Sequence, residues 1–508
     1  MTPPAENQVV VPPMDTHNQT LISNVHPPDW VNPKPAPRYH LVVIGAGTAG
    51  LVTAAGAAGL GAKVALVEKS LLGGDCLNVG CVPSKVMIRS SRAVEDVRSA
   101  SKFGVSGSAT PEVDFSAVME RMRRLRAQIS HHDSARRFRD LGIDVFLGEG
   151  QFSGPDTVTV NDSTLRFKKA VIATGAKPVH PPVEGLKETG FLTNETVFTL
   201  TERPHHLAMV GGGPVGCELS QAFCRLGTQV TIIEAGSQFL AREDPEAATI
   251  IAETFKKEGI DVRLATQLKR VTAAQGKKRL HLESEGQETT LEVDEIFVGV
   301  GRAPNMNNLN LEGAAVEYTH RGVVVDDYLQ TTNSRIYAAG DICMGWKFTH
   351  AADAAARIVI QNALFLGRKK LSALTMPWCT YTDPEVAHVG MYERDAKEKG
   401  YEVDTFVKPL DQVDRGLIDA EVGFVKILVK KGTDRILGAT IVARHAGEMI
   451  SEITLAMVAG VGLTTLSGVI HPYPTQAEAI KQVGDLYRRT RLTPLVKKLV
   501  STWLTWTG

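Results

Sequence analysis

The sequence predicts an α/β protein with two Rossmann-like dinucleotide-binding domains and an α+β domain at its C-terminal end. Near the start of the chain an apolar strand, a glycine turn, a helix and a second strand follow one another, and the same order recurs further along. The chain has 508 residues, which is too many for one hydrophobic core, so we expect about three or four domains.

Composition and charge exclude several classes of protein. The 56 basic and 56 acidic residues give a formal net charge of zero, which does not indicate a nucleic-acid partner. Six cysteines are too few for a secreted disulfide scaffold. The first residues lack the basic and apolar regions of a secretory signal, and no stretch approaches the roughly 18 apolar residues of a spanning helix. We therefore expect a cytoplasmic enzyme.

The first 38 residues form a proline-rich segment. Prolines disfavour regular secondary structure, so we expect an extended arm pinned to the protein by Ile22, Val25 and Trp30. A disordered tail fits the composition equally well.

The first nucleotide-binding pattern begins at Tyr39. An apolar strand leads into Gly45, Gly47 and Gly50, an alanine-rich helix follows, and a second strand ends at Glu68. The glycines allow the backbone to approach a pyrophosphate at the helix N-terminus, and the acid is placed to accept a hydrogen bond from a ribose hydroxyl. The flanking strands and the acid make the glycine motif specific.

Two cysteines follow in the run GGDCLNVGCVPSK. On a regular helix, Cys76 and Cys81 would lie about 8.6 Å apart at their Cα atoms, whereas a disulfide tolerates only up to roughly 6.8 Å. Pairing therefore requires the backbone to leave the helix between them, where Gly80 lies. We interpret the pair as a redox-active disulfide held against a flavin. Two buried core thiols are the alternative.

The nucleotide-binding pattern recurs with Gly211, Gly213 and Gly216 in its turn and Glu234 at the end of its second strand. Two such sites imply two dinucleotides. Because a disulfide does not readily take a hydride from nicotinamide, we predict FAD as relay at one site and NAD(P)H as donor at the other. A carboxylate at Glu234 would repel a 2′-phosphate, so NADH is favoured over NADPH, although Arg242 leaves NADPH open.

Three further motifs follow predicted strands. Thr174 and Gly175 end the run VIATG, Gly301 and Arg302 lie in VGVGRAPN, and Asp341 lies in IYAAGDI. Open α/β sheets bind their ligands at the carboxyl ends of strands, so we expect these residues near a nucleotide.

Together these motifs resemble those of the flavin disulfide reductases, which include dihydrolipoamide dehydrogenase, glutathione reductase and mercuric reductase. The resemblance covers residues 39 to about 490, and the runs GCVPSKVMIR, LAREDPE and YTDPEVAHVG look closest to the mercuric reductase branch. It implies a homodimer whose C-terminal domain forms the interface. The predicted divisions are a Pro-rich arm (1–38), the first part of the FAD domain (39–185), the NAD(P)H domain (186–305), the second part of the FAD or central domain (306–375), the dimerisation domain (376–490) and an amphipathic tail (491–508).

The resemblance also implies roles for individual residues. Cys81 would be the flavin-facing thiol and Cys76 the exchange thiol that meets the substrate. Lys85 would approach the flavin and pair with Glu218. The residues that the resemblance assigns to FAD are Gly45, Gly47, Gly50, Glu68, Gly74, Lys85, Gly150, Thr174, Gly175, Arg302, Asp341 and Thr349, and those for NAD(P)H are Gly211, Gly213, Gly216, Glu234 and Gly301.

Two positions depart from the family pattern. Relatives usually have threonine before the first cysteine, where this chain has Asp75, and a carboxylate there would repel the FAD phosphates unless it turns away. Relatives also carry a histidine that serves the partner subunit's cysteines. Aligning the run IHPYPTQAEAIK on Glu478 puts Tyr473 at that position, with His471 two residues earlier.

The tyrosine bears on the substrate. Histidine titrates near 6.5 and tyrosine near 10, so Tyr473 is a poor base at neutral pH. Reduction of a disulfide substrate needs a proton for the leaving thiolate, whereas a soft metal ion bound by Cys76 and Cys81 needs none. We therefore predict NAD(P)H-dependent reduction of a soft metal ion or another small oxidant. The alternatives are a dihydrolipoamide-dehydrogenase-like disulfide reductase that uses His471, and a redox- or metal-sensing flavoprotein without turnover.

The last residues predict an amphipathic helix. Thr493 and Pro494 have the character of an N-cap and a first helical residue, and apolar residues follow at helical spacing. We expect this helix to dock on the dimer. Peripheral contact with an anionic membrane is the less favoured interpretation.

Overall fold

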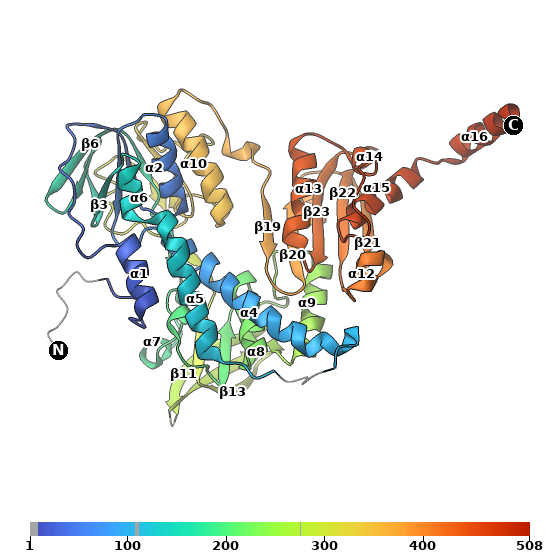
Figure 1. Cartoon of the computed structure of the whole chain (residues 1–508), viewed down its shortest axis with the longest axis horizontal. Helices are drawn as coiled ribbons and strands as arrows, with labels where there is room; N and C mark the ends of the chain where they lie inside the picture. The colour runs from blue at the N-terminus through green and yellow to red at the C-terminus, as the bar shows by residue number, and fades with distance from the viewer. Residues whose placement is uncertain (1–8, 107–110, 275) are drawn as a thin grey trace. The chain divides into compact units, whose positions relative to one another are not determined.

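The structure is a computed structural model that describes residues 9–106, 111–274 and 276–508. The chain divides into two compact units (Figure 1). Unit 1 contains the described residues up to Gly212 together with Ala222–Ala235 and Thr266–Leu374, and unit 2 contains Gly213–Gln221, Gly236–Ala265 and Thr375–Gly508. The six predicted domain divisions stay predictions.

The largest sheet of unit 1 has the strand order β3-β2-β1-β6-β5-β4, with β18 also paired to β6. Strands β3, β2, β1, β6 and β18 run parallel, and β6, β5 and β4 pair antiparallel. Its parallel strands are buried along most of their length, as expected where helices cover both faces. The strands are β1 Tyr39–Ile44, β2 Val64–Glu68, β3 Asp144–Leu147, β4 Gly150–Gly154, β5 Thr157–Val160, β6 Ser163–Ile172 and β18 Ile336–Ala338.

The first predicted nucleotide-binding pattern is confirmed. Helix α2, Thr48–Gly59, connects β1 to the parallel strand β2 and begins directly after Gly47. Helix α10, Thr349–Leu364, packs against α2. The other described helices of this part are α3 Gly74–Asn78, α4 Cys81–Ser99, η1 Ala100–Phe103, α5 Phe115–Ser130, η2 His131–Asp133, α6 Ala135–Asp140, α7 Leu186–Thr189 and η3 Val197–Thr199.

The second predicted pattern also forms. Strands β8, His206–Val210, β9, Gln229–Ile233, and β14, Glu295–Val298, run parallel, and helix α8, Pro214–Arg225, connects the first two. The sequence therefore folds twice into a Rossmann-like unit. The smaller sheets of unit 1 are β11-β12-β13 (Thr266–Ala274, Lys277–Ser284, Gln287–Val293), β7-β15 (Ala176–Pro178, Arg302–Pro304) and β16-β17 (Tyr318–Thr319, Gly322–Val323).

The N-terminal arm, the described residues 9–38, differs from the prediction because it contains a helix. Helix α1, Thr16–Val25, is possible because no proline lies between its N-cap Asp15 and its C-cap His26. Ile22 and Val25 are buried, as predicted, and Trp30 donates its indole N–H to the Val145 carbonyl at 3.2 Å. The expectation of an extended arm was wrong for this stretch.

Unit 2 is built on an antiparallel sheet of order β19-β20-β23-β22-β21. Helices α13 and α15 pack on it through a core that includes Ile441, Ile453 and Ile480. The strands are β19 Pro377–Thr380, β20 Glu385–Gly390, β21 Val403–Pro409, β22 Phe424–Lys430 and β23 Ile436–Ala443, and the helices of this part are α9 Pro245–Glu258, α11 Glu393–Glu398, η5 Leu410–Gln412, α12 Asp414–Ile418, α13 Ala446–Val458, α14 Leu463–Leu466 and α15 Glu478–Thr490.

The chain ends in helix α16, Pro494–Thr507. Its predicted start is confirmed, because the Thr493 hydroxyl accepts a hydrogen bond from the Val496 N–H at 3.3 Å and Pro494 is the first helical residue. Among the described residues, no helix is both long and apolar enough to cross a membrane.

Candidate active site

The two predicted redox cysteines lie on either side of a break between two helices. Helix α3 carries Cys76 and ends at Asn78, and Cys81 is the first residue of α4. Between them Gly80 adopts φ −136° and ψ −111°, outside the helical region. The backbone thus departs from helix at the predicted position, as pairing of the two sulfurs requires.

Both cysteines are in the thiol form, and their side chains interact. The hydrogen bond with Cys81, followed by burial, raises the pKa of Cys76. The Cys81 Sγ also lies 3.2 Å from the hydroxyl oxygen of Thr349 at the start of α10. Thr349, which the resemblance assigns to FAD, therefore also contacts the cysteine pair. Cys81 is the more exposed of the two thiols.

A buried chain of hydrogen bonds connects the N-terminal arm to the segment between the cysteines. Arg126 on α5 donates one guanidinium N–H to the Asn78 carbonyl at 2.6 Å and another to Asn18 Oδ1 at 2.7 Å. Asn18 lies on α1 and donates to the carbonyls of Val11 and Pro13. All three linked side chains are buried. Sequence reasoning missed this connection, because a single arginine in an amphipathic helix gives no signal of its partners.

A second link runs through Leu72, just before the cysteine loop. Its N–H donates to the Val25 carbonyl at 3.1 Å, and its carbonyl accepts from the Asn78 side chain at 3.1 Å. Asn78 also donates to the Gly74 carbonyl at 2.8 Å. The arm and the cysteine loop are thus joined at two places.

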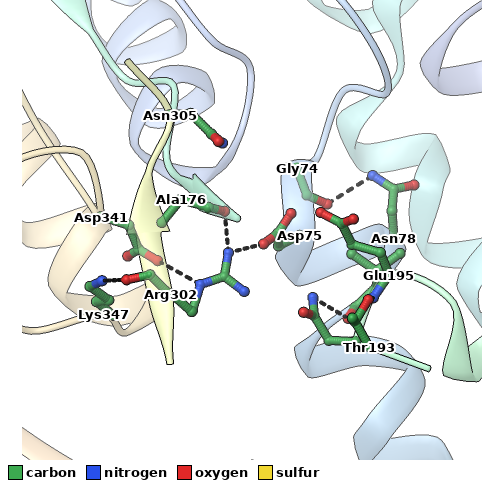
Figure 2. Close-up of polar contacts among 12 residues, drawn as sticks. Gly74, Asp75, Asn78, Ala176, Thr193, Glu195, Arg302, Asn305, Asp341 and Lys347 are labelled. Atoms are coloured by element: carbon green, nitrogen blue, oxygen red, sulfur yellow. Dashed lines mark hydrogen bonds and ion pairs between the residues drawn. The ribbon is translucent and has the colours of Figure 1, made fainter. Parts of the chain in front are cut away.

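Asp75, the departure from the family pattern, pairs with an arginine (Figure 2). Its carboxylate accepts from Arg302, whose Nε also lies 3.5 Å from Asp341 Oδ2. The Arg302 guanidinium donates further to the Ala176 carbonyl, and its own carbonyl accepts from Lys347 at 2.6 Å. Arg302 therefore offsets the charges of two carboxylates, which is how the structure accommodates an acid beside Cys76.

Two other carboxyls near this arginine are affected by their surroundings. Burial raises the pKa of Asp341, and Arg302 acts in the opposite direction. Burial, with a further contribution from Asp75, raises the pKa of Glu195, which Figure 2 shows on the same side as Asp75. Three carboxyl groups, those of Asp75, Glu195 and Asp341, thus surround the Arg302 guanidinium.

The two nucleotide-binding turns have the same local geometry. Gly45 and Gly211 adopt φ +100° and +107°, and a Cβ at either would lie within 2.7 Å of a carbonyl oxygen, that of Ala173 or Gly299. Such positions admit only glycine.

The glutamate at the end of the second strand of each pattern makes the same kind of hydrogen bond. The Ala46 N–H donates to Glu68 and the Gly212 N–H donates to Glu234, both at 2.7 Å. Glu68 accepts a second bond from the Ser70 N–H at 2.8 Å. Both carboxylates therefore lie against the turn in which a dinucleotide would bind.

The remaining predicted cofactor residues lie at the ends of strands or helices. Gly74 begins α3, where a Cβ would lie 2.7 Å from the Gly47 Cα atom, so the two glycines bring the cysteine helix against the first turn. Gly150 begins β4. Thr174 and Asn305 exchange hydrogen bonds at 2.9 and 3.0 Å, next to Gly175. Gly301 precedes β15.

Comparison with known proteins identifies the family. Residues 39–356 match the pyridine nucleotide-disulphide oxidoreductase family, and residues 376–483 match its dimerisation domain. The chain belongs to the pyridine nucleotide-disulphide oxidoreductases. The resemblance to flavin disulfide reductases is therefore confirmed, and the dimerisation-domain match supports a homodimer.

Relatives in this oxidoreductase family include enzymes of two kinds. The chain is 37% identical to a mercuric reductase of Staphylococcus aureus over 445 residues, which cover 87% of this chain and 81% of the relative. It is 32% identical to a dihydrolipoyl dehydrogenase of Geobacillus stearothermophilus over 463 residues, or 90% and 97% of the two chains. The Cu(II) complex of the HOCl-induced flavoprotein disulfide reductase RclA from Escherichia coli superposes with a TM-score of 0.78 at 29% identity, covering 87% of this chain and 98% of that one.

Membership of the oxidoreductase family supports FAD as cofactor, and the residues present fit it. The first turn has backbone rather than side chains where Gly47 faces Gly74, which leaves room for a pyrophosphate. Among the described residues, no group of three or more His, Cys, Asp or Glu side chains is arranged to hold a resident metal ion.

The predicted acid-base residues of the oxidoreductase lie in its dimerisation domain. Tyr473 is 70% exposed and donates to Asp414 at 2.7 Å, which raises the pKa of the phenol. The His471 side chain is 5% exposed, and its Nε2 lies 3.0 Å from Glu452. Glu478 begins α15, and its buried Oε2 has no hydrogen-bond partner among the described residues.

Lys85 and Glu218 belong to different units. Lys85 lies on α4 in unit 1, whereas Glu218 lies on α8 in unit 2 and accepts from the Tyr381 N–H at 2.9 Å. Their predicted pairing stays a prediction.

Proposed function

We propose that the protein is an FAD-dependent oxidoreductase that passes electrons from NADH through the Cys76–Cys81 pair to a soft metal ion or another small oxidant. The interaction of the two thiols at the helix break, in the same unit as the first nucleotide-binding turn, is the observation that carries this proposal. FAD, when bound, supplies a two-electron relay between a nicotinamide and a disulfide.

The two thiols are differentiated by their surroundings. Cys81 begins a helix of 19 residues, where the helix dipole favours a thiolate. The hydrogen bond with Cys81, together with burial, raises the pKa of Cys76, so Cys76 tends to keep its proton. This order supports Cys81 as the flavin-facing thiolate and Cys76 as the thiol that meets the substrate.

The electron balance is simple for a divalent soft metal. Two electrons and two protons convert the Cys76–Cys81 disulfide to two thiols. The thiols bind the metal ion with release of their protons, two electrons pass to the metal, and the disulfide forms again. No protonated leaving group is needed, so an enzyme with Tyr473 in place of a histidine can complete this cycle.

The exposed Tyr473 disfavours disulfide substrates. Its hydrogen bond to Asp414 raises the pKa of the phenol further, so Tyr473 does not act as a base near neutral pH. His471, the residue required by the dihydrolipoamide-dehydrogenase-like alternative, is already engaged by Glu452. For the donor, the Glu234 carboxylate at the second turn supports NADH over NADPH.

The test is steady-state oxidation of NADH with a panel of acceptors. The panel contains Hg(II), Cu(II), lipoamide, glutathione disulfide and a quinone; copper is included because the similar RclA structure is a Cu(II) complex. We expect turnover with a soft metal ion and little with either disulfide. Turnover with lipoamide above that with every metal ion would contradict the proposal, and the absence of NADH turnover with any acceptor of the panel would favour the sensing alternative.

A substitution tests the proton-transfer argument directly. We expect Tyr473→His to raise lipoamide or glutathione disulfide reduction at least tenfold, because a placed general acid contributes roughly 10² to 10⁴ in rate. The matched control is Tyr318→His, since Tyr318 is also exposed and also donates to a carboxylate, that of Glu312. An unchanged rate for Tyr473→His would show that Tyr473 does not limit the reduction of disulfide substrates.

A further inference from the structure

Helix α16 lies outside both family matches and has two distinct faces. At about 100° per residue, its large apolar residues fall on one half of the helix circumference, with Thr507 as the polar residue among them. Lysine, serine and threonine occupy the other half. The apolar half contains Leu495, Val496, Leu499, Val500, Trp503, Leu504 and Trp506.

Most of the apolar face of α16 is left uncovered by the described residues of its own chain, with Val496 near the start of the helix half-buried. The helix, which lies at the C-terminal end of the chain in Figure 1, has no buried residue. The side chains of Trp503, Leu504 and Trp506 are largely exposed. Its side-chain hydrogen bonds run within the helix, as from Thr505 to the Ser501 carbonyl. A patch of this kind on a soluble enzyme marks an interaction site.

The charge around α16 has one sign. From Arg488 to the end of the chain there are five basic residues and no acidic residue, the basic ones being Arg488, Arg489, Arg491, Lys497 and Lys498. Pairing of α16 with its copy in a second chain would bring these cations together without a carboxylate from the segment to offset them. An anionic surface, by contrast, complements them.

The aromatic residues and the length fit a surface rather than a span. Tryptophan prefers the boundary between hydrocarbon and water, and Trp503 and Trp506 both lie on the apolar half. A helix of 14 residues is about 21 Å long, shorter than the roughly 30 Å hydrocarbon core. Lysine side chains can extend from the polar half toward the headgroups.

We propose that α16 binds the surface of an anionic lipid bilayer, with its apolar half in the interface and its cations at the headgroups. The sequence alone favoured docking on the dimer. The exposed apolar face, and the presence of basic but no acidic residues from Arg488 onward, favour a membrane surface instead. The proposal does not depend on the identity of the electron acceptor.

The experiment is sedimentation of the full-length FAD-loaded enzyme with vesicles of phosphatidylcholine alone or with about 30% phosphatidylglycerol. We expect binding to the anionic vesicles to be at least tenfold tighter at low salt, and to weaken at about 0.5 M salt because the charges are screened. Each cation near such a surface contributes about fivefold in partitioning, so K497E/K498E weakens binding at least tenfold. W503A/W506A weakens it at both salt concentrations.

The matched charge control is K256E/K257E, which reverses two adjacent exposed lysines in the last turn of α9 and is expected to bind as the wild type does. Equal binding to both vesicle types, or unchanged binding of K497E/K498E, would overturn the proposal. Light scattering of a variant ending at Thr490 adds a further check. Conversion of a dimer to a monomer would assign the apolar face to a second copy of the chain and would also overturn it.

Discussion

The two ends of the chain, which both lie outside the family match, differ in what they bury. The N-terminal arm places Leu21 and Val25 in the core, and its buried Asn18 is hydrogen-bonded on both sides of its amide. Helix α16 exposes apolar residues, and within the described part of the chain its side-chain hydrogen bonds lie inside the helix. The arm is packed as part of unit 1. The tail leaves an apolar face exposed, which is the face proposed to bind a membrane. An added segment can thus be interpreted from where its polar atoms find partners.

The two ends of the chain also differ in their contacts with the candidate active site. The arm contacts the cysteine loop at two places, through Arg126 and through Leu72, whereas no described contact joins α16 to a predicted catalytic residue. Changes in the arm should therefore affect stability and the cysteines together. Changes in the tail should affect neither.

The largest expected effect comes from Arg126→Met. The substitution leaves the Asn78 carbonyl and Asn18 Oδ1 buried without their donor, so we expect a loss of about 3 kcal/mol in the free energy of unfolding. Alkylation of Cys76 and Cys81 should become faster as the loop loosens. Urea unfolding and mass spectrometry measure the two effects. The control is Arg124→Met on the same helix, whose side chain is exposed and which should change stability by less than about 0.5 kcal/mol.

A smaller loss is expected from Asn18→Leu. The side chains are similar in size, but leucine leaves the Pro13 carbonyl and the Arg126 guanidinium without their partner, which costs about 2 kcal/mol. Thiol alkylation should accelerate here too, although residue 18 is remote in sequence from both cysteines. Gln19→Leu, at the exposed neighbouring position, serves as control. Equal alkylation rates in the two variants would mean that the arm does not position the loop.

The arm should also respond to pH, because its N-cap is an acid. Burial alone would raise the pKa of Asp15, but hydrogen bonds from the Asn18 N–H and from Arg123 hold it below the ordinary value of 3.8. The stability contributed by this carboxylate is present above about pH 4 and is lost as the pH falls through the lowered pKa. Hydrogen exchange of α1, corrected for intrinsic rates, should therefore rise below that pH.

Exchange in α16 provides the comparison for that measurement. The tail has no side-chain carboxylate, so its corrected exchange should show no such step. Asp15→Asn should remove the step from the arm. A step of the same size in both helices would indicate general acid unfolding instead.

The smallest effect is expected at the tail's own cap. Thr493→Ala removes the bond to the Val496 N–H and should reduce local helicity at a cost of about 1 kcal/mol. Because no residue of α16 is buried, the unfolding midpoint of the whole protein should stay the same. A clear fall in that midpoint would show that the helix packs on the protein, and the contrast between the two ends would disappear.

Local patterns predicted much of the fold and the site. Both nucleotide-binding turns, the break at Gly80 and the cap at Thr493 follow from residue types whose backbone preferences act over a few positions. These features are decided locally, so one sequence is sufficient to find them.

The contacts that the sequence did not predict are long-range. Asp75 pairs with Arg302, and Arg126 is hydrogen-bonded to Asn18. The partners in each pair are far apart in the sequence, so no local pattern indicates the contact. In the arm, counting prolines gave an extended segment, but a helix needs only a short proline-free stretch with a cap and a face to bury. The helix is stabilised by packing, which composition does not reveal.

The central claim is that the Cys76–Cys81 pair receives the electrons of NADH. Anaerobic addition of one equivalent of NADH to the oxidised FAD enzyme tests it most directly, followed by thiol counting and the visible spectrum. We predict two new thiols per chain, at Cys76 and Cys81, with a long-wavelength thiolate-to-flavin band and little bleaching of the flavin. In Cys76→Ser the same equivalent should bleach the flavin instead. Bleaching of the wild-type flavin without new thiols would contradict the account.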